Sequence, residues 1–210
     1  MITLRNLTKR YGSLVAVDGL NIEVRKGEIF GFIGPNGAGK TTTIRMTAGV
    51  LKPTEGEVLI GGVPMASDPV AAKKVIGFIP DRPFLYEKLT GMEFMRFSAD
   101  LYGVGNGDFR EKAGGLLNRF SLHDWGDQLI EAYSHGMKQR LVIASALLHD
   151  PRVIIVDEPM VGLDPAGIRM VKDLLRVLAG GGRRSLCPPT PWRSRKISAT
   201  GSASSTRDGW

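Results

Sequence analysis

The sequence lacks the features that mark secreted, disulfide-stabilised and membrane-spanning proteins. It contains one cysteine, Cys187, which excludes an internal disulfide framework and a zinc site built from cysteines. No apolar run approaches the roughly 18 residues that are needed to cross a bilayer. The first residues, MITLRNLTKRYG, contain no signal-peptide core, so we expect the protein to stay in the cytoplasm.

An even distribution of positive charge is also missing. The net charge is +7, which by itself would favour a nucleic-acid or acidic-membrane partner. Residues 181–210 carry six Arg or Lys side chains against Asp208, which leaves +2 for residues 1–180. The basicity therefore belongs to the tail, and we expect no nucleic-acid partner.

The composition and the hydrophobic periodicity predict an α/β protein. Residues 153–156, Val-Ile-Ile-Val, suit a strand that is buried on both faces of a parallel sheet. From residue 81 to 150 the pattern is mainly helical, and residues 180–210 have the composition of a disordered segment. Strands are expected at residues 2–6, 14–24, 28–33, 57–60, 75–79 and 153–156, and helices at 41–50, 91–102, 108–119, 136–149 and 166–178.

A glycine-rich phosphate loop lies between an expected strand and an expected helix. It matches G-x-x-x-x-G-K-[ST], whose backbone N–H groups surround phosphate oxygens at a helix N-terminus. Lys40 would reach the β- and γ-phosphates, Thr41 would ligate Mg²⁺, and Thr42 would contact the α-phosphate side. A chance glycine-rich turn is the alternative, and the flanking elements argue against it. The nucleotide-binding residues are Gly34, Pro35, Asn36, Gly37, Ala38, Gly39, Lys40, Thr41 and Thr42.

Two acids follow the apolar run at residues 153–156. At the carboxyl end of a parallel strand, Asp157 would face the crevice that holds the phosphates and would bind Mg²⁺ through water. Glu158 would polarise the attacking water as general base. Many strands end in solvated acids, so this pattern alone does not indicate a magnesium site. It does so only in combination with the phosphate loop.

Residues 133–140, Tyr-Ser-His-Gly-Met-Lys-Gln-Arg, resemble the signature motif of the ABC ATPases, usually Leu-Ser-Gly-Gly-Gln. Ser134 and Gly136 match the motif. The same residues also fit a plain helix N-cap at Ser134, followed by a buried apolar face. Both interpretations hold together, since the resemblance implies that this helix end contacts the γ-phosphate of ATP bound to a second protomer.

The resemblance covers residues 1 to about 180 and implies the fold class. The expected fold is a P-loop NTPase with a RecA-like parallel core, an antiparallel β subdomain and a helical subdomain inserted at about residues 81–150. It implies an ATP-binding and ATP-hydrolysing subunit of an exporter-like ABC transporter, with ATP and Mg²⁺ as cofactors. Such a subunit forms a homo- or heterodimer and drives polytopic membrane permease subunits from the cytoplasmic face of the membrane.

Other functions stay open beside this one. A non-transport ABC ATPase is an alternative, although the chain has neither a coiled-coil insertion nor a second cassette. A catalytically impaired ATP-binding remnant is another. A GTPase is set aside, since the guanine-reading Asn-Lys-x-Asp motif is missing.

The resemblance also assigns single residues. Tyr11 matches the aromatic residue that stacks on adenine, with a core tyrosine as the alternative. Asp81 stands where the family usually has a glutamine that touches Mg²⁺ and the attacking water; its carboxylate can still ligate Mg²⁺. Residues 83–102 match the surface that receives the transporter's coupling helix. Within it, Phe84–Tyr86 either dock a partner or fill the core. Residues 162–164 match a loop at the dimer interface.

One expected residue is missing. Family members carry a histidine after the helix at residues 166–178, where it contacts the γ-phosphate, and no histidine of this chain follows Asp157. Read with a one-base shift, the codons of residues 187–193 can encode Ser-Thr-His-Thr-Leu-Glu. Our hypothesis is a single-base slip near Gly180 that scrambled the residues from about 181 onward. Such a slip would lower hydrolysis sharply and leave ATP binding through Lys40 largely intact.

Overall fold

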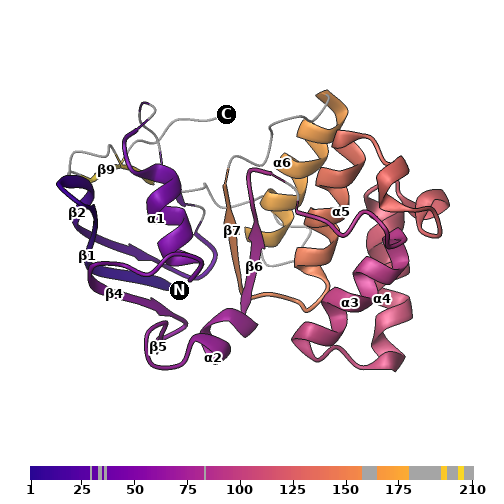
Figure 1. Ribbon diagram of the computed structural model, residues 1–210, viewed down its shortest axis with the longest axis horizontal. Coiled ribbons are helices and arrows are strands. Elements are labelled where there is room, and N and C mark those ends of the chain that lie inside the picture. Colours follow the sequence, from indigo (N-terminus) through magenta and orange to yellow (C-terminus); the bar gives the residue numbers. More distant parts are fainter. Residues whose placement is uncertain are drawn as a thin grey trace, which may run out of the picture. The chain divides into compact units, whose positions relative to one another are not determined.

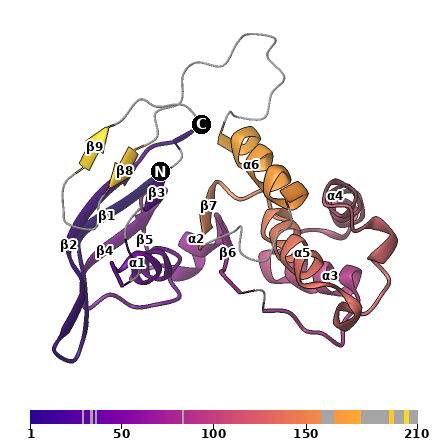
Figure 2. The same cartoon turned by 90° about the horizontal axis from the view of Figure 1, so that it is seen from above.

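The computed structural model describes residues 1–28, 30–32, 35, 37–82, 84–157, 165–179, 195–197 and 203–205. It divides the chain into two units, Met1–Lys73 with Leu174–Trp210, and Lys74–Asp173 (Figures 1 and 2). The second unit is larger than the helical subdomain expected at about residues 81–150, because it also contains two strands and the start of the last helix. In the part of the chain that is described, no helix has the length and apolarity that a bilayer crossing requires.

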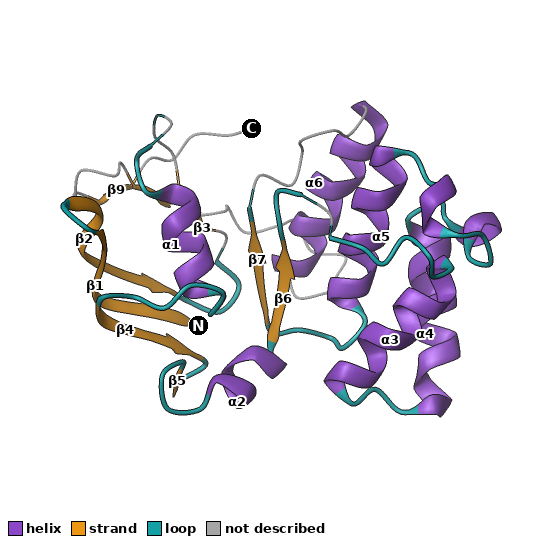
Figure 3. Cartoon of the chain, viewed as in Figure 1, coloured by secondary structure: helices purple, strands orange, loops and turns teal. Residues whose placement is uncertain are grey.

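The first unit contains a four-stranded antiparallel sheet (Figure 3). Leu4 of the central strand β1 pairs with Ile22 on one side and with Val58 on the other, and all three side chains are buried. The sheet therefore has one apolar face, as the alternating sequence predicts. Its strands, in spatial order, are β2 (Leu14–Val24), β1 (Ile2–Tyr11), β4 (Glu55–Ile60) and β5 (Val63–Pro64).

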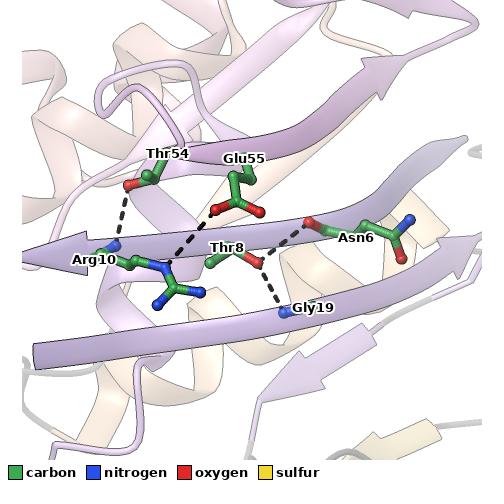
Figure 4. Close-up of polar contacts among 6 residues, drawn as sticks. All are labelled: Asn6, Thr8, Arg10, Gly19, Thr54 and Glu55. Atoms are coloured by element: carbon green, nitrogen blue, oxygen red, sulfur yellow. Dashed lines mark hydrogen bonds and ion pairs between the residues drawn. The ribbon is translucent and has the colours of Figure 1, made fainter.

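Side-chain hydrogen bonds hold β1 where its pairing is irregular (Figure 4). The buried Thr8 hydroxyl accepts a hydrogen bond from the Gly19 amide at 2.9 Å and donates one to the Asn6 carbonyl at 3.4 Å. Towards the end of the strand, the Arg10 amide donates to the Thr54 hydroxyl at 3.1 Å. The next residue is Tyr11, so these bonds fix the strand end that carries it.

The phosphate loop lies between β3 (Phe30–Phe32) and α1 (Lys40–Thr47). β3 pairs in parallel with β8 (Arg195–Ile197), which pairs in turn with β9 (Ala203–Ser205). These two strands differ from the disorder expected over residues 180–210, and the rest of that segment lies outside the described residues. The physical reason is that the N–H and C=O groups of β3 require partners, which β8 supplies.

The second unit contains a two-stranded parallel sheet, β6 (Ile76–Ile79) and β7 (Val153–Val156), which pair residue for residue from Ile76 with Val153 to Ile79 with Val156. The parallel pairing predicted for residues 153–156 is thereby confirmed. The helices of this unit are α3 (Gly91–Tyr102), α4 (Asn106–Arg119) and α5 (His135–Leu147), with short 3₁₀ turns η1 (His123–Trp125) and η2 (Ile130–Ala132). Along the chain, α2 (Pro69–Lys74) and α6 (Pro165–Ala179) each cross the boundary between the two units.

Helix α3 shows why the helix boundaries were readable. Thr90 caps it, since its hydroxyl accepts from the Glu93 amide at 3.1 Å while the Glu93 carboxylate accepts from the Thr90 amide at 2.7 Å. Such a capping box is encoded locally by Thr-x-x-Glu. Helices α3, α4 and α5 share one apolar core, lined by Phe94, Met95, Phe109, Leu117, Leu141 and Ile143.

Candidate nucleotide-binding site

Two glycines give the phosphate loop its shape. Gly37 and Gly39 have φ values of +83° and +78°, a region that L-residues with a side chain rarely adopt. A Cβ on Gly39 would lie 2.3 Å from the Ala16 carbonyl oxygen, whereas a Cβ on Gly37 would meet nothing within 4 Å. Gly39 is also the N-cap of α1 and offers no side-chain cap, so the positive end of this helix is left for an anion.

Lys40 lies across the loop. Its Nζ donates to the Pro35 carbonyl at 2.7 Å, and the Ala38 amide reaches the same oxygen at 3.3 Å. The hydroxyl of the buried Thr43 donates to the Gly39 carbonyl at 2.9 Å and secures the first turn of α1. In the described part of the loop, Lys40 is therefore held against Pro35. Of the predicted nucleotide ligands here, Thr41 and Thr42 are half-buried at the start of α1, and Gly34 and Asn36 lie outside the described residues.

Tyr11 lies on the same unit as the phosphate loop. It is 48% exposed at the end of β1, so the alternative of a core tyrosine is wrong. The Nζ of Lys9 lies 5.3 Å from the centre of its ring. Tyr11 pairs with Leu14 of β2, and Ala16, two residues further along β2, touches Gly39. One strand therefore connects the exposed aromatic ring with the phosphate loop.

The structure brings Asp81 and Asp157 to one edge of the β6–β7 sheet. The Asp157 amide donates to the Ile79 carbonyl at 2.9 Å, which extends the ladder by one residue, and Asp81 follows Ile79 by two residues. The Asp157 side chain is only 2% exposed. A carboxylate buried to this degree requires hydrogen bonds or a cation. The other predicted acid, Glu158, lies outside the described residues.

The carboxylates at this edge fit Mg²⁺. This ion binds through one or two carboxylates, substrate phosphates and water, and does not need an all-protein cage. Within the described residues, no cluster of three or more His, Cys, Asp or Glu side chains suited to a metal is found. Asp81 and Asp157 are the residues that would hold the ion in this unit.

The N-cap predicted at the signature motif is confirmed. Ser134 precedes α5, and its Oγ accepts a hydrogen bond from the Met137 amide at 3.3 Å. Ser134 and His135 are exposed, whereas Gly136 is half-buried. The preceding Tyr133 is buried. The serine is therefore exposed at the start of a helix whose buried residues, Leu141–Ala144 among them, lie further along.

Tyr133 ties the signature motif to the start of α3. Its hydroxyl donates to the Trp125 carbonyl, and its ring meets that of Trp125 edge-on, with centroids 5.9 Å apart. A Cβ on Gly91 would lie 2.3 Å from the Tyr133 hydroxyl, so a residue without a side chain is needed there. The sequence did not predict this contact, because nothing in the local pattern indicates which helix a buried tyrosine meets.

Two more features escaped sequence analysis. The Gln139 side chain is fully buried in α5, and neither its Oε1 nor its Nε2 has a hydrogen-bond partner among the described residues. The sequence did contain a signal for the burial of Gln139, because a residue four positions before the apolar Ile143 lies on the same face of a helix. Lys138 forms an ion pair with Glu87 at 2.5 Å, which no spacing rule indicates because 51 residues separate the two.

The surface expected to meet a coupling helix carries exposed aromatic side chains. Phe84 is 84% exposed, and the exposed Tyr86 packs edge-on against Phe97 with ring centroids 5.3 Å apart. The alternative that these two residues fill the core is wrong, whereas Leu85 is half-buried. Residues 162–164 lie outside the described residues.

Residues 17–161 match the family model described as ABC transporter. The chain belongs to this family. It is 44% identical over 179 residues to the uncharacterized ABC transporter ATP-binding protein YhcH of Bacillus subtilis, covering 85% of this chain and 57% of that protein. It is 42% identical over 179 residues to the bacitracin transport ATP-binding protein BcrA of Bacillus licheniformis, covering 85% of this chain and 58% of that protein.

A solved structure supports the fold. It is a dimeric, post-hydrolysis state of an ATP-binding cassette bound to ADP and Pi, with a TM-score of 0.78 and 28% identity, covering 85% of this chain and 83% of that one. The α/β fold of the ATP-binding cassettes, expected from the sequence, is thereby confirmed. This ABC chain spans 57–58% of the length of the two curated relatives named above.

Proposed function

We propose that this chain binds and hydrolyses ATP as a subunit of an ABC transporter and powers transport through separate membrane permease subunits. The observation that carries the proposal is the conformation of the described part of the phosphate loop, Pro35 and residues 37–40. Gly37 and Gly39 hold conformations that favour glycine, Lys40 lies over the loop, and the exposed Tyr11 ring is joined to it through β2.

The roles proposed for the remaining residues follow from their chemistry. Thr41, Asp157 and Asp81 would hold Mg²⁺, which supplies charge neutralisation for the phosphates when it is bound. Glu158 would accept the proton of the attacking water. Lys40 and the loop amides would bind and orient the triphosphate, and Tyr11 would stack on the adenine.

Ser134 and Gly136 would complete the site of a second protomer in a homo- or heterodimer. The exposed position of Ser134 at a helix N-terminus supports this role, since such a helix end attracts phosphate. The permease subunits would dock on the surface that carries Phe84 and Tyr86, which places the protein at the cytoplasmic face of the membrane. The bacitracin relative is named as a transport ATP-binding protein, which supports the proposed role in transport.

Nucleotide titration tests the proposal. We expect the full chain to bind a fluorescent ATP analogue in the presence of Mg²⁺, and Lys40→Ala to weaken this binding by about 100-fold, because a charge-assisted contact to phosphate is lost. Lys26→Ala, at an exposed lysine of the same unit, is the matched control and should bind like the wild type. Affinity that is unchanged in Lys40→Ala would refute the proposal.

A second candidate function is ATP binding without turnover. The observation in its favour is that no histidine follows Asp157 in the sequence. Comparing ATP turnover of the wild-type chain with that of Glu158→Gln separates the two. A hydrolysing subunit loses turnover in the variant, whereas a binding-only chain shows the same background rate in both.

A further inference from the structure

The loop at residues 84–90, between β6 and α3, is bonded to the segment at residues 125–133 that leads into α5. The Ile130 amide donates to the Leu89 carbonyl at 2.9 Å, and the Glu131 amide donates to the Glu87 carbonyl at 3.1 Å. A β-bridge between Thr90 and Leu129 lies among these bonds. The two segments therefore form one ordered element next to the signature motif.

Two neighbouring residues of this loop, Glu87 and Lys88, form ion pairs of opposite polarity. Glu87 pairs with Lys138 at 2.5 Å, and Lys88 pairs with Glu131 at 2.6 Å. The two lysines differ in their surroundings, because the Lys138 side chain is 21% exposed and that of Lys88 is 84% exposed. The Glu87–Lys138 pair is thus held in place by packing around the lysine stem.

Lys138 belongs to the first turn of α5. Its amide donates to the Ser134 carbonyl at 2.9 Å, so its backbone is bonded to the signature serine itself. The hydrogen bond from Lys138, together with its charge, holds the pKa of the Glu87 carboxyl below its ordinary value. Glu87 is therefore ionised at neutral pH and available as a fixed anchor for this helix end.

We propose that Glu87 and Lys138 are a positioning pair, which orients Ser134 so that it closes on the ATP held by a second copy of this chain. This inference rests on the proposed function. The pair acts through the helix end and touches no nucleotide, so it governs dimer closure and leaves ATP binding by the single copy unchanged. Because the same loop carries Phe84 and Tyr86, the pair also joins the signature serine to the exposed aromatic surface.

Four versions of the full chain test the pair, all with Glu158→Gln to prevent hydrolysis. They are the otherwise unchanged chain, Glu87→Gln, Lys138→Gln and the double variant. Sedimentation with Mg²⁺ and ATP measures dimerisation, and titration of a fluorescent ATP analogue at low protein concentration measures binding. Each single variant should weaken dimerisation by about three- to tenfold, and the double variant should be no weaker than the singles. ATP affinity should stay the same.

The second ion pair is the matched control. Lys88→Gln and Glu131→Gln remove a pair of similar length from the same loop without touching α5, and they should dimerise like the reference chain. Equal weakening by both pairs, or effects of Glu87→Gln and Lys138→Gln that simply add, would overturn the positioning role. Urea unfolding of each variant is measured in parallel, and a loss of dimerisation that follows the loss of stability would overturn it too.

Failure of this inference is distinguishable from failure of the proposed function. A reference chain that binds ATP through Lys40 and remains monomeric at every protein concentration overturns the positioning pair and leaves nucleotide binding standing. A chain without any Lys40-dependent affinity for ATP overturns both.

Discussion

Gly39 of the phosphate loop lies directly against Ala16 of β2, so closely that a Cβ on Gly39 would be 2.3 Å from the Ala16 carbonyl oxygen. This contact joins the loop that precedes α1 to the strand that begins beside Tyr11. Backbone atoms occupy both sides of the contact, so neither side can yield by a change of rotamer. A glycine is therefore needed at position 39 for two reasons: its φ is positive, and there is no room for a Cβ atom beside Ala16.

Replacing Gly39 by alanine should therefore damage the site more than replacing Gly37. Gly37→Ala introduces only the strain of a left-handed residue, about 1–2 kcal/mol, whereas Gly39→Ala adds the clash with Ala16. We expect Gly39→Ala to lose more unfolding free energy in urea and to bind ATP more weakly. Equal stability of the two variants would show that the close approach to β2 does not exist in solution.

Gln139 is a buried polar side chain for which the described residues offer no hydrogen-bond partner. Its amide is fully buried and makes no hydrogen bond within the part of the chain that the structure describes, and an unsatisfied buried amide costs about 1–3 kcal/mol. Gln139→Met keeps the length of the side chain and removes the polar atoms, so it should stabilise the chain by about 1 kcal/mol in urea unfolding. Gln128→Met, at an exposed position, is the control and should change little. A destabilised Gln139→Met would mean that the amide is bonded in solution.

His149 should make stability depend on pH. Its Nε2 lies 3.0 Å from the Ile76 carbonyl, and its ring stacks on Tyr102 with centroids 3.7 Å apart. Burial lowers the pKa of His149, against the opposing effects of the Ile76 carbonyl and Asp150. The unfolded chain, with a histidine pKa of about 6.5, therefore takes up a proton first as the pH falls. The contribution of His149 to the free energy of unfolding is fully present above about pH 6.5, and it is lost as the pH falls towards the folded-state pKa.

Urea unfolding of His149→Gln checks this expectation. The variant should lose less unfolding free energy than the wild type between about pH 7 and pH 5, where the unfolded histidine gains its proton. His123→Gln, at an exposed histidine, should keep the wild-type slope. If both variants and the wild type have the same slope, His149 is not the titrating group.

The missing histidine after Asp157 leads to a prediction about the tail. A chain whose reading frame is restored after Gly180 should hydrolyse ATP faster than the present one, because it would regain a residue at the γ-phosphate. Its ATP affinity should change little, since Lys40 and Tyr11 are the same in both chains. Equal turnover of the two chains would refute the prediction. Sequencing the gene through codon 180 tests the slip itself, and a clean frame without a family-like alternative would end that hypothesis.

Much of the secondary structure followed from local sequence. Helix α3 begins and ends at the predicted residues because Thr90 and Glu93 form a capping box and Gly103 adopts a positive φ after the last turn. The strand at residues 153–156 was readable from its four β-branched side chains. The phosphate loop and the N-cap at Ser134 were readable for the same reason, since their hydrogen bonds connect residues a few positions apart.

The sequence by itself determined which residues could form a phosphate cradle and which serine caps a helix, because those properties depend on neighbours along the chain. Only the tertiary structure decided that Tyr11 is exposed, that Gly39 meets Ala16, that Asp81 and Asp157 end neighbouring strands, and that Lys138 reaches Glu87. The physical reason is that these relationships join residues far apart in sequence. Strand register and helix packing set such distances, and no local pattern of side chains encodes them.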